Sequence, residues 1–310
     1  SEEIQKLSKG LIKLGVQEGD HVAVIGRNRP SLYWSLLACQ HIGAIPVPLY
    51  QDAVAEEMEY ILSHCGASFA IVGDQEQVDK ILEISDRLKG FKDIVFVDPK
   101  GLRKYDNKNL HSLTDILEIG SSDSAELDKE LNSRVEKVTG DTTCVLLYTS
   151  GTTGKSKGVV QTHRAIIGAS GGANQHDSWT HDDYLLSYLP MAWVGDFMIS
   201  VAQGMGAGAC INCPEGAETM QVDLREIGPS IFFGPPPLWE RLKTSVFIRI
   251  EDAAFFKKAA FNYFMAHAEK VGRDIIEKRK VGLFDRMKYS LGNFLIYAPL
   301  KNMLGFSNVR

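Results

Sequence analysis

The chain has 310 residues, of which 44% are hydrophobic and 24% charged, a balance typical of a soluble globular protein. A net charge of −5, a pI near 5.9 and the lack of a basic stripe with interleaved aromatic residues argue against a nucleic-acid-binding protein. No apolar run reaches the ~18 residues of a membrane span, and the polar start SEEIQKLSKG is unlike a secretory signal. We therefore expect a cytoplasmic location, and membrane association stays open.

Helical and strand patterns alternate from the first residues. Short, continuously apolar runs are separated by segments of about ten residues with apolar side chains at helical spacing. Strands are predicted at 21–25, 44–49, 69–72 and 94–98, and helices at about 4–14, 30–42, 53–63 and 75–88. This order predicts a parallel sheet covered by helices on both faces. Pro46 and Pro48 assign the second strand to a sheet edge or a strand end, because proline cannot donate to a strand ladder.

A polar surface segment at 100–137 interrupts the alternation, and beyond Val246 the strand pattern is lost among aromatic-rich, basic helical runs. Between these segments, strands are predicted at 143–148, 184–189, 209–213 and 230–234, and helices at 163–173, 194–206, 220–227 and 238–243. We expect three parts, which are a first α/β subdomain at 1–138, a second at 139–245 and a helical insertion at 246–310.

The string YTSGTTGKSKGV, at Tyr148–Val159, carries most of the functional information. It follows an apolar run with the length of a buried strand. Its glycines allow backbone angles with which a loop can wrap closely around an anion, its hydroxyls can donate hydrogen bonds, and its lysines add positive charge. The loop therefore predicts a phosphate site, and a nucleotide triphosphate is the ligand that fits best. The predicted binding residues are Thr149, Ser150, Gly151, Thr152, Thr153, Gly154, Lys155 and Lys157.

A Walker loop is one alternative for this string. It requires G-x-x-x-x-G-K-[ST], and Gly154-Lys155-Ser156 matches its end, but its opening glycine would stand at the position of Thr149. A nucleoside triphosphatase built on that loop would rely on Lys155 rather than Lys157. A non-catalytic module that binds a nucleotide or an acyl group is a second alternative.

The complete string instead resembles the phosphate loop of the AMP-forming adenylate ligases, the family of acyl-CoA synthetases, luciferases and peptide-synthetase adenylation domains. That loop usually reads [YF]-T-S-G-[ST]-T-G-x-P-K-G-V, and the departure here is Ser156, which stands where proline is usual. The resemblance implies an α/β fold of stacked, parallel-rich α/β/α subdomains, as in the large N-terminal domain of the acyl-CoA synthetases. The helical insertion near the C-terminus is similar to the long-chain branch.

A second string, LPMAWVGD at Leu189–Asp196, resembles the LPLxH motif beside the carboxylate-binding pocket of the family, with Trp193 where histidine is common. The resemblance implies that Trp193, Val194 and Gly195 belong to the substrate pocket and that the indole lines or gates an acyl channel. A core tryptophan beside a strand end is the alternative.

A third string, FFGPPPLWER at Phe232–Arg241, resembles the V-P-R-x-x-E block of the long-chain branch, with Pro237 in place of the usual arginine. It implies that the Gly234 backbone approaches the acyl chain, and a plain strand-to-helix turn is the alternative. Two interpretations stay open for the basic, aromatic helices that follow. They form an element near an acyl tunnel or on a membrane surface, or they form a cap on the core with solvated lysines.

Members of this family join a carboxylic acid to ATP, which gives an acyl-adenylate and pyrophosphate, and coenzyme A then displaces AMP. The resemblance implies that Lys157 and Thr152 act in catalysis, because the loop neutralises the charge that builds on pyrophosphate. ATP, Mg²⁺ and coenzyme A are the implied cofactors and substrates. The triphosphate itself would carry most of the magnesium coordination, so no metal-ligating side chain is expected.

The chain matches only part of the family pattern. It begins within the region that leads to the first strand of the family, and it lacks the adenine-contacting Y-G-x-T-E block, the ribose-binding aspartate and the small C-terminal lid. We therefore expect a fragment of a fatty-acid–CoA ligase, with long chains favoured, that is inactive alone. ATP, a fatty acid and coenzyme A are the expected partners, nucleic acid is not, and the sequence specifies no oligomeric state.

Overall fold

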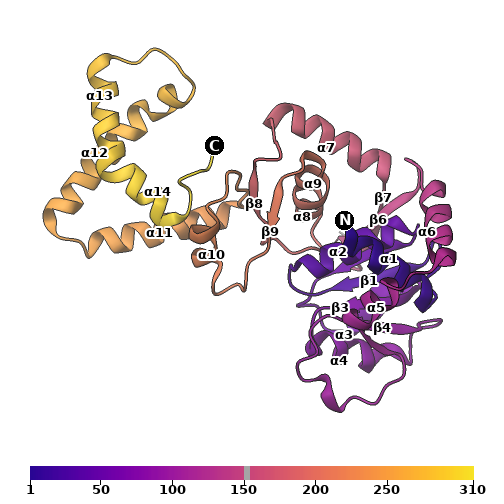
Figure 1. Cartoon of the computed structure of the whole chain (residues 1–310). Helices are drawn as coiled ribbons and strands as arrows, with labels where there is room; N and C mark the ends of the chain where they lie inside the picture. Colours follow the sequence, from indigo (N-terminus) through magenta and orange to yellow (C-terminus); the bar gives the residue numbers. More distant parts are fainter. Residues whose placement is uncertain (150–153) are drawn as a thin grey trace. The chain divides into compact units, whose positions relative to one another are not determined.

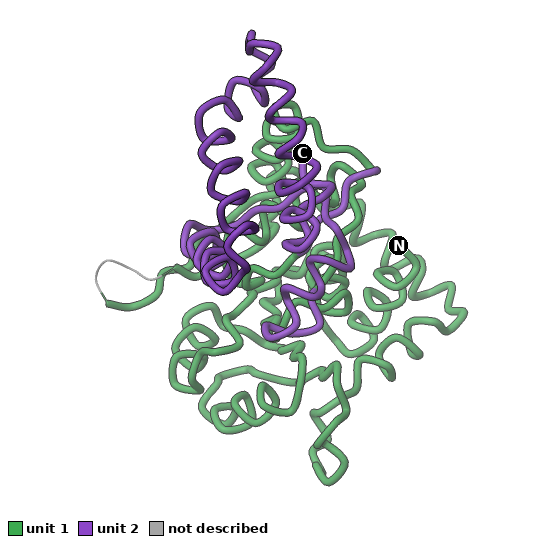
Figure 2. Tube along the Cα trace, turned by 90° about the vertical axis from the view of Figure 1, so that its left-hand side faces the viewer, with its two compact units in different colours: residues 1–181, 187–213 green, residues 182–186, 214–310 purple. Residues whose placement is uncertain are grey.

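The computed structural model describes residues 1–149 and 154–310. They form two compact units, which Figure 2 shows in different colours. Unit 1 contains residues 1–181 and 187–213, and unit 2 contains residues 182–186 and 214–310. Residues on both sides of position 138 therefore share unit 1.

Unit 1 is built on a five-stranded parallel sheet in the order β2-β1-β3-β4-β5, of which Figure 1 labels β1, β3 and β4. Its strands are β1 (His21–Ile25), β2 (Ile45–Leu49), β3 (Ala67–Val72), β4 (Asp93–Phe96) and β5 (Leu110–Ser112). The helices around it are α1 (Glu2–Leu14), α2 (Pro30–His41), α3 (Ala55–Cys65), α4 (Gln75–Ser85), α5 (Leu113–Gly120) and α6 (Ala125–Lys137), with a 3₁₀ turn at Leu102–Lys104. The predicted α/β class and parallel sheet are confirmed.

Alternate residues of the strands face two separate hydrophobic clusters. Val22 and Val24 of β1 pack in the cluster that contains α1, α2, α5 and α6, whereas Ala23 and Ile25 pack in the cluster that contains α3 and α4. Figure 1 shows α1 and α2 on one side of the sheet and α3 and α4 on the other. Because both faces of these strands are buried, apolar residues occupy consecutive positions along them.

The two prolines of β2 explain its place at the edge of the sheet. β2 pairs with β1 alone within the sheet, with Val22 opposite Pro46 and Val24 opposite Pro48. A proline has no N–H to donate, so an edge is the position that disturbs the strand ladder least. A further strand, β6 (Thr143–Thr149), packs beside β2 but pairs with another partner.

That partner is β7 (Lys157–Thr162), which runs antiparallel to β6. A loop followed by a helix was expected after residue 148, and this expectation was wrong for β7. The strand is largely exposed, so it lacks the buried stripe from which a strand is predicted. The remaining elements of unit 1 are α7 (His163–Asp177), α8 (Val194–Asp196), a π-helix (Phe197–Gly204), α9 (Met205–Ala207) and β9 (Cys210–Asn212).

Unit 2 is mainly helical. It contains β8 (Tyr184–Leu186), α10 (Met220–Ile227), α11 (Pro236–Glu251), α12 (Phe255–Ile276), α13 (Leu283–Gly292), a π-helix (Asn293–Tyr297) and α14 (Ala298–Leu304). The strand predicted at 230–234 is reduced to a single bridge between Leu185 and Ile231, because three prolines follow at once. Within the described residues, no helix combines the length and the apolar character needed to cross a bilayer.

Helices α1 and α5 of unit 1 approach each other so closely that only glycine fits at two positions. A Cβ on Gly10 would lie 2.1 Å from the carbonyl oxygen of Ile116, and a Cβ on Gly120 would lie 1.7 Å from that of Lys6. Each methyl group would therefore force the two helix backbones apart.

We expect Gly120→Ala to lower the free energy of unfolding by about 1–3 kcal/mol, the usual cost of overpacking. Gly168→Ala in α7 is the matched control, because an added Cβ there meets no atom within 4 Å, and alanine favours a helix by up to ~1 kcal/mol over glycine. Chemical denaturation of both variants measures the difference. Equal unfolding midpoints would contradict the close packing of α1 on α5.

Candidate functional site

The predicted phosphate loop connects the two strands of the β6–β7 hairpin. Thr149 and Lys157 form the last cross-strand pair, so their exposed side chains leave the hairpin on the same side. Gly154 has a φ of 99°, a left-handed conformation that glycine adopts without strain. The predicted residues Ser150, Gly151, Thr152 and Thr153 lie outside the described residues, and their roles stay predictions.

Helix α3 contacts both arms of this hairpin. The Tyr60 hydroxyl donates to the carbonyl oxygen of Ser156 at 3.1 Å, and Lys155 Nζ lies 5.2 Å from the centre of the Tyr60 ring. One helical turn later, His64 Nδ1 and the Tyr148 hydroxyl are 2.7 Å apart, and the two rings meet edge to face. Burial raises the pKa of the Tyr148 phenol, so this hydroxyl keeps its proton and can donate to His64.

Gly158 stands opposite Tyr148 in the hairpin. A Cβ at this position would lie 3.2 Å from Tyr148 Cζ and 3.1 Å from Leu146 Cδ1. The missing side chain therefore leaves room for the Tyr148 ring, whose hydroxyl then reaches α3.

The predicted substrate-pocket segment forms a tight turn at the start of α8. The Trp193 N–H donates to Pro190 O at 2.9 Å, and the Asp196 N–H donates to Trp193 O at 3.1 Å. Trp193 is half-buried and Val194 is exposed. A Cβ on Gly195 would lie only 1.9 Å from Trp193 Cζ3, so the indole rests directly on the Gly195 backbone.

A buried carboxylate lies beneath this turn. Asp196 is 1% exposed and accepts hydrogen bonds from the hydroxyls of Tyr33 at 2.6 Å, Ser187 at 2.9 Å and Ser200 at 2.9 Å. Burial raises the pKa of Asp196 above its ordinary value of 3.8, and the three hydrogen bonds oppose that rise. Burial and the neighbouring Asp196 charge raise the pKa of the Tyr33 phenol well above its ordinary range, so Tyr33 stays a donor.

Asn28, which follows β1, extends this network to the chain that enters the turn. Its amide donates to Ser187 O at 3.0 Å and to Leu189 O at 2.7 Å. The residues that precede the turn are therefore tied to the carboxyl end of β1, and the turn itself is tied to α2 through Tyr33.

Sequence reasoning missed the supporting residues of both segments. An acid within the apolar run Val194–Val201 could have pointed to Asp196, since a buried acid must find partners. Tyr60 and His64 stand four positions apart, a spacing that places two side chains on one helix face, but the helix predicted at about 53–63 ended one residue before His64. Neither pattern names the partner, which comes from a distant part of the chain.

Gly234 belongs to unit 2, where the Trp239 side chain engages its backbone. The Trp239 indole N–H donates to Gly234 O at 2.8 Å, and a Cβ on Gly234 would lie 3.0 Å from the same nitrogen. Trp239 also packs with Phe232 and Phe306, at 5.6 and 5.5 Å between ring centres, and the two phenylalanine rings are 5.0 Å apart. Within unit 2 the Trp239 indole therefore lies against the Gly234 backbone, and the expected approach to an acyl chain stays a prediction.

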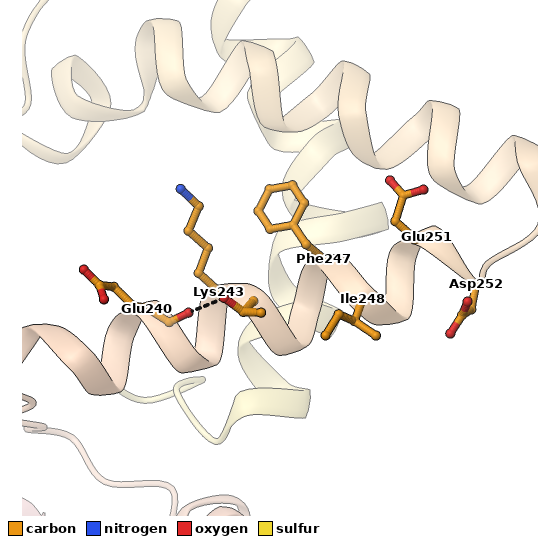
Figure 3. Close-up of a pocket in the computed structure, with 7 residues that line it drawn as sticks. Glu240, Lys243, Phe247, Ile248, Glu251 and Asp252 are labelled. Atoms are coloured by element: carbon orange, nitrogen blue, oxygen red, sulfur yellow. Dashed lines mark hydrogen bonds between the residues drawn. The ribbon is translucent and has the colours of Figure 1, made fainter.

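A cavity of about 640 Å³ opens along α11 in unit 2. Lys243, Phe247 and Glu251 project from one side of the helix (Figure 3), and Lys243 Nζ lies 5.9 Å from the centre of the Phe247 ring. The side chains that line it come from α11 and the adjoining Asp252, and none is a predicted site residue. Among the described residues, no group of three metal-binding side chains is placed to hold an ion.

Comparisons with known proteins agree with this arrangement. The model of a family described as AMP-binding enzyme matches residues 1–284. Two curated relatives are the long-chain-fatty-acid–CoA ligases ACSBG2 of Homo sapiens, 27% identical over 313 residues, and of Mus musculus, 29% identical over 318 residues. The alignments cover 99% and 98% of this chain but 46% of each relative, so the chain spans less than half of their length.

Solved structures share the fold. A long-chain-fatty-acid–CoA ligase of Archaeoglobus fulgidus matches 81% of this chain and 46% of its own, with a TM-score of 0.65 and 20% identity. ATP-bound MatB of Rhodopseudomonas palustris matches 77% of this chain and 44% of its own, with a TM-score of 0.63 and 22% identity. Because the family model spans residues 1–284 of the 310, the chain belongs to the AMP-binding enzyme family.

Proposed function

We propose that this chain is part of an AMP-forming ligase that joins a fatty acid, preferably a long-chain one, to coenzyme A. The observation that carries the proposal is the YTSGTTGKSKGV string at the turn of the β6–β7 hairpin, in a chain that the AMP-binding family model matches. The curated relatives named above are long-chain fatty-acid ligases, which supports the choice of acid.

In the proposed reaction, a carboxylate oxygen of the acid attacks the α-phosphorus of ATP and pyrophosphate leaves. The thiol of coenzyme A then attacks the acyl carbon and AMP leaves. Lys157 and the Thr152 hydroxyl are proposed to stabilise the negative charge that develops on pyrophosphate as it leaves. Hydrogen-bond donors and positive charges placed at developing charge lower the barrier of such a step. Mg²⁺ is proposed to arrive with the triphosphate oxygens, which are ligands of the kind it prefers.

The Trp193–Gly195 turn is proposed to form one wall of the acid pocket. The support for this role is local: the half-buried indole rests on Gly195, and a buried hydrogen-bond network holds the turn from below. Gly234 is proposed to lie near the acyl chain. The adenine, ribose and lid contacts are proposed to come from further parts of a longer enzyme, so that the 310-residue chain does not turn over alone.

The Walker-type alternative places Lys155 on the phosphates. In the described structure the Lys155 ammonium lies over the Tyr60 ring of α3, whereas Lys157 stands at the mouth of the hairpin beside Thr149. This geometry favours the ligase over a Walker-type triphosphatase.

A cytoplasmic location is proposed for the enzyme, with peripheral contact of unit 2 with a membrane. One face of α13 and the π-helix after it presents exposed apolar side chains, which are Leu283, Phe284, Met287, Leu291, Phe294 and Leu295. Residues 246–310 carry twelve Lys and Arg against six Asp and Glu, although the whole chain is acidic. An apolar stripe among basic residues is complementary to an anionic lipid surface.

In the complete enzyme, Lys157→Ala is expected to lower acid-dependent exchange between ATP and pyrophosphate roughly 100-fold or more, because a donor to the leaving group is lost. Lys155→Ala is expected to lower it about fivefold at most, since only the contact with the Tyr60 ring is removed. The assay is run over a panel of fatty acids of increasing length.

A larger loss of activity in Lys155→Ala than in Lys157→Ala would support the Walker alternative. ATP hydrolysis to ADP without an acid would support it as well. Nucleotide binding without any exchange would support a non-catalytic module. Rapid pyrophosphate release by the 310-residue chain alone would overturn the proposal that it is inactive.

The stability of the turn is expected to depend on pH through Asp196. The folded-state pKa of this carboxyl is raised, so its contribution to stability is complete below the ordinary pKa of 3.8 and is lost as pH rises through the folded-state value. The gap in unfolding temperature between the wild type and Asp196→Asn is therefore expected to narrow from about pH 4 to pH 7.

Ser200→Ala is the matched control for this titration. It keeps the carboxyl but removes one donor that lowers its pKa, so its stability should fall more steeply with pH than that of the wild type. If the unfolding temperatures of the wild type, Asp196→Asn and Ser200→Ala change with pH in parallel, the role of Asp196 is contradicted.

Phe284→Ser combined with Phe294→Ser is expected to weaken binding to anionic vesicles roughly tenfold or more, since two apolar side chains are lost from the interface. Co-sedimentation with phosphatidylcholine vesicles, with and without phosphatidylserine, measures it. Phe255→Ser with Phe256→Ser is the control, because these exposed residues lie on α12. If a second copy of this chain covers the apolar stripe instead, the wild type will be a dimer, and the Phe284→Ser, Phe294→Ser double variant will be a monomer.

A further inference from the structure

We propose that Tyr60 and His64 of α3 are positioning residues for the phosphate hairpin, and that Tyr60 supplies the restraint that a proline at position 156 would otherwise provide. This inference rests on the proposed function of the hairpin as the triphosphate site. It concerns the arms of the hairpin, all of whose residues named here are described.

The two side chains hold opposite arms. His64 Nδ1 lies 2.7 Å from the hydroxyl of Tyr148, which is the residue before the last one of β6. Tyr60 donates to the carbonyl oxygen of Ser156, the residue before the first one of β7, at 3.1 Å. The Tyr60 and His64 rings are 5.7 Å apart, so the two contacts form one continuous patch on α3.

Helix α3 provides a firm support for this patch. The helix buries Met58, Ile61 and Leu62 in the hydrophobic cluster that contains Leu146 and Tyr148 of β6, and Tyr60 packs against the same cluster. A close-packed interior transmits position from one element to the next. The hairpin arms are therefore placed relative to the parallel sheet through α3, and not only through the β6–β7 hydrogen bonds.

The contact at Ser156 coincides with the departure from the family string. Proline would fix φ near −65° and restrict the residue before it, and serine does neither. Here the Tyr60 hydroxyl holds the carbonyl of Ser156, and the Tyr60 ring holds the side chain of Lys155. Tyr60 thus restrains from outside the same two residues that a proline would restrain from within the backbone.

The same contact separates the roles of the two lysines. A cation over an aromatic face is attracted to it, so Tyr60 draws the Lys155 ammonium toward α3. Lys157 is displaced by two residues and pairs with Thr149 across the hairpin. Within the described residues Lys157 forms no ion pair, and its charge is available at the mouth of the hairpin.

The test is a double-mutant cycle in the complete enzyme. Tyr60→Phe keeps the ring and removes the hydroxyl, and it is expected to weaken ATP binding roughly three- to tenfold, the effect of one neutral hydrogen bond. The KM for the fatty acid should not change. Ser156→Pro alone is expected to alter ATP binding about twofold at most, and in the Tyr60→Phe background it should restore most of the lost affinity.

Tyr105→Phe is the matched control. It also removes a tyrosine hydroxyl that donates a hydrogen bond in unit 1, to Asp79 at 2.5 Å, but this residue follows the 3₁₀ turn and bonds α4, not the hairpin. It should leave the ATP affinity unchanged. His64→Ala tests the other arm and is expected to weaken ATP binding without rescue by Ser156→Pro, because the proline restrains only the arm that leads to β7.

Hydrogen exchange without nucleotide separates this inference from the proposed function. Tyr60→Phe should accelerate exchange of the amides from Lys155 to Val159, and Ser156→Pro should reverse that effect. If the wild type does not bind ATP, the proposed function fails. The hydrogen-exchange result still shows whether Tyr60 restrains the arm of the hairpin that leads to β7. If the wild type binds ATP and Tyr60→Phe changes neither affinity nor exchange, or the proline does not rescue, the inference is overturned.

Discussion

Burial of the strands on both faces is the constraint on which the rest of unit 1 depends. The sheet residues alternate between two clusters, and β6 continues this alternation although it pairs outside the sheet, with Val145 and Leu147 in one cluster and Leu146 and Tyr148 in the other. β6 is therefore a strand that is held on two sides, and the core fixes the position at which it ends.

The second segment, the turn before α8, is held by polar contacts in addition to the apolar packing of Met191 and Phe197. Asp196, Tyr33 and Ser187 form a buried network whose members come from α8, α2 and the chain between β8 and α8. A partly satisfied network of this kind would be costly in a low-dielectric interior, whereas a fully hydrogen-bonded one defines a single arrangement. The turn that carries Trp193 is in this way specified by direction-dependent bonds, which apolar packing alone does not provide.

The features that the sequence predicted are those whose cause is local. The parallel strands were visible because burial on both faces leaves unbroken apolar runs, and the edge position of β2 was visible because proline lacks a donor. β7 was missed because it is exposed, and β5 because three residues are too few to show a period. The phosphate site was likewise predicted from the residue types of one short string, and its role stays a prediction. The contacts of Tyr60 with Ser156 and of Asn28 with Leu189 span 96 and 161 positions, and only the folded chain reveals them.

The contact between Trp193 and Gly195 bears on how the two positions of this turn can vary. A side chain at Gly195 would collide with the indole where it now lies, so a substitution there requires the indole to rotate away or to be replaced by a smaller side chain. Residue choices at 193 and 195 are therefore expected to be coupled, so that a change at one position alters which side chains the other can accept.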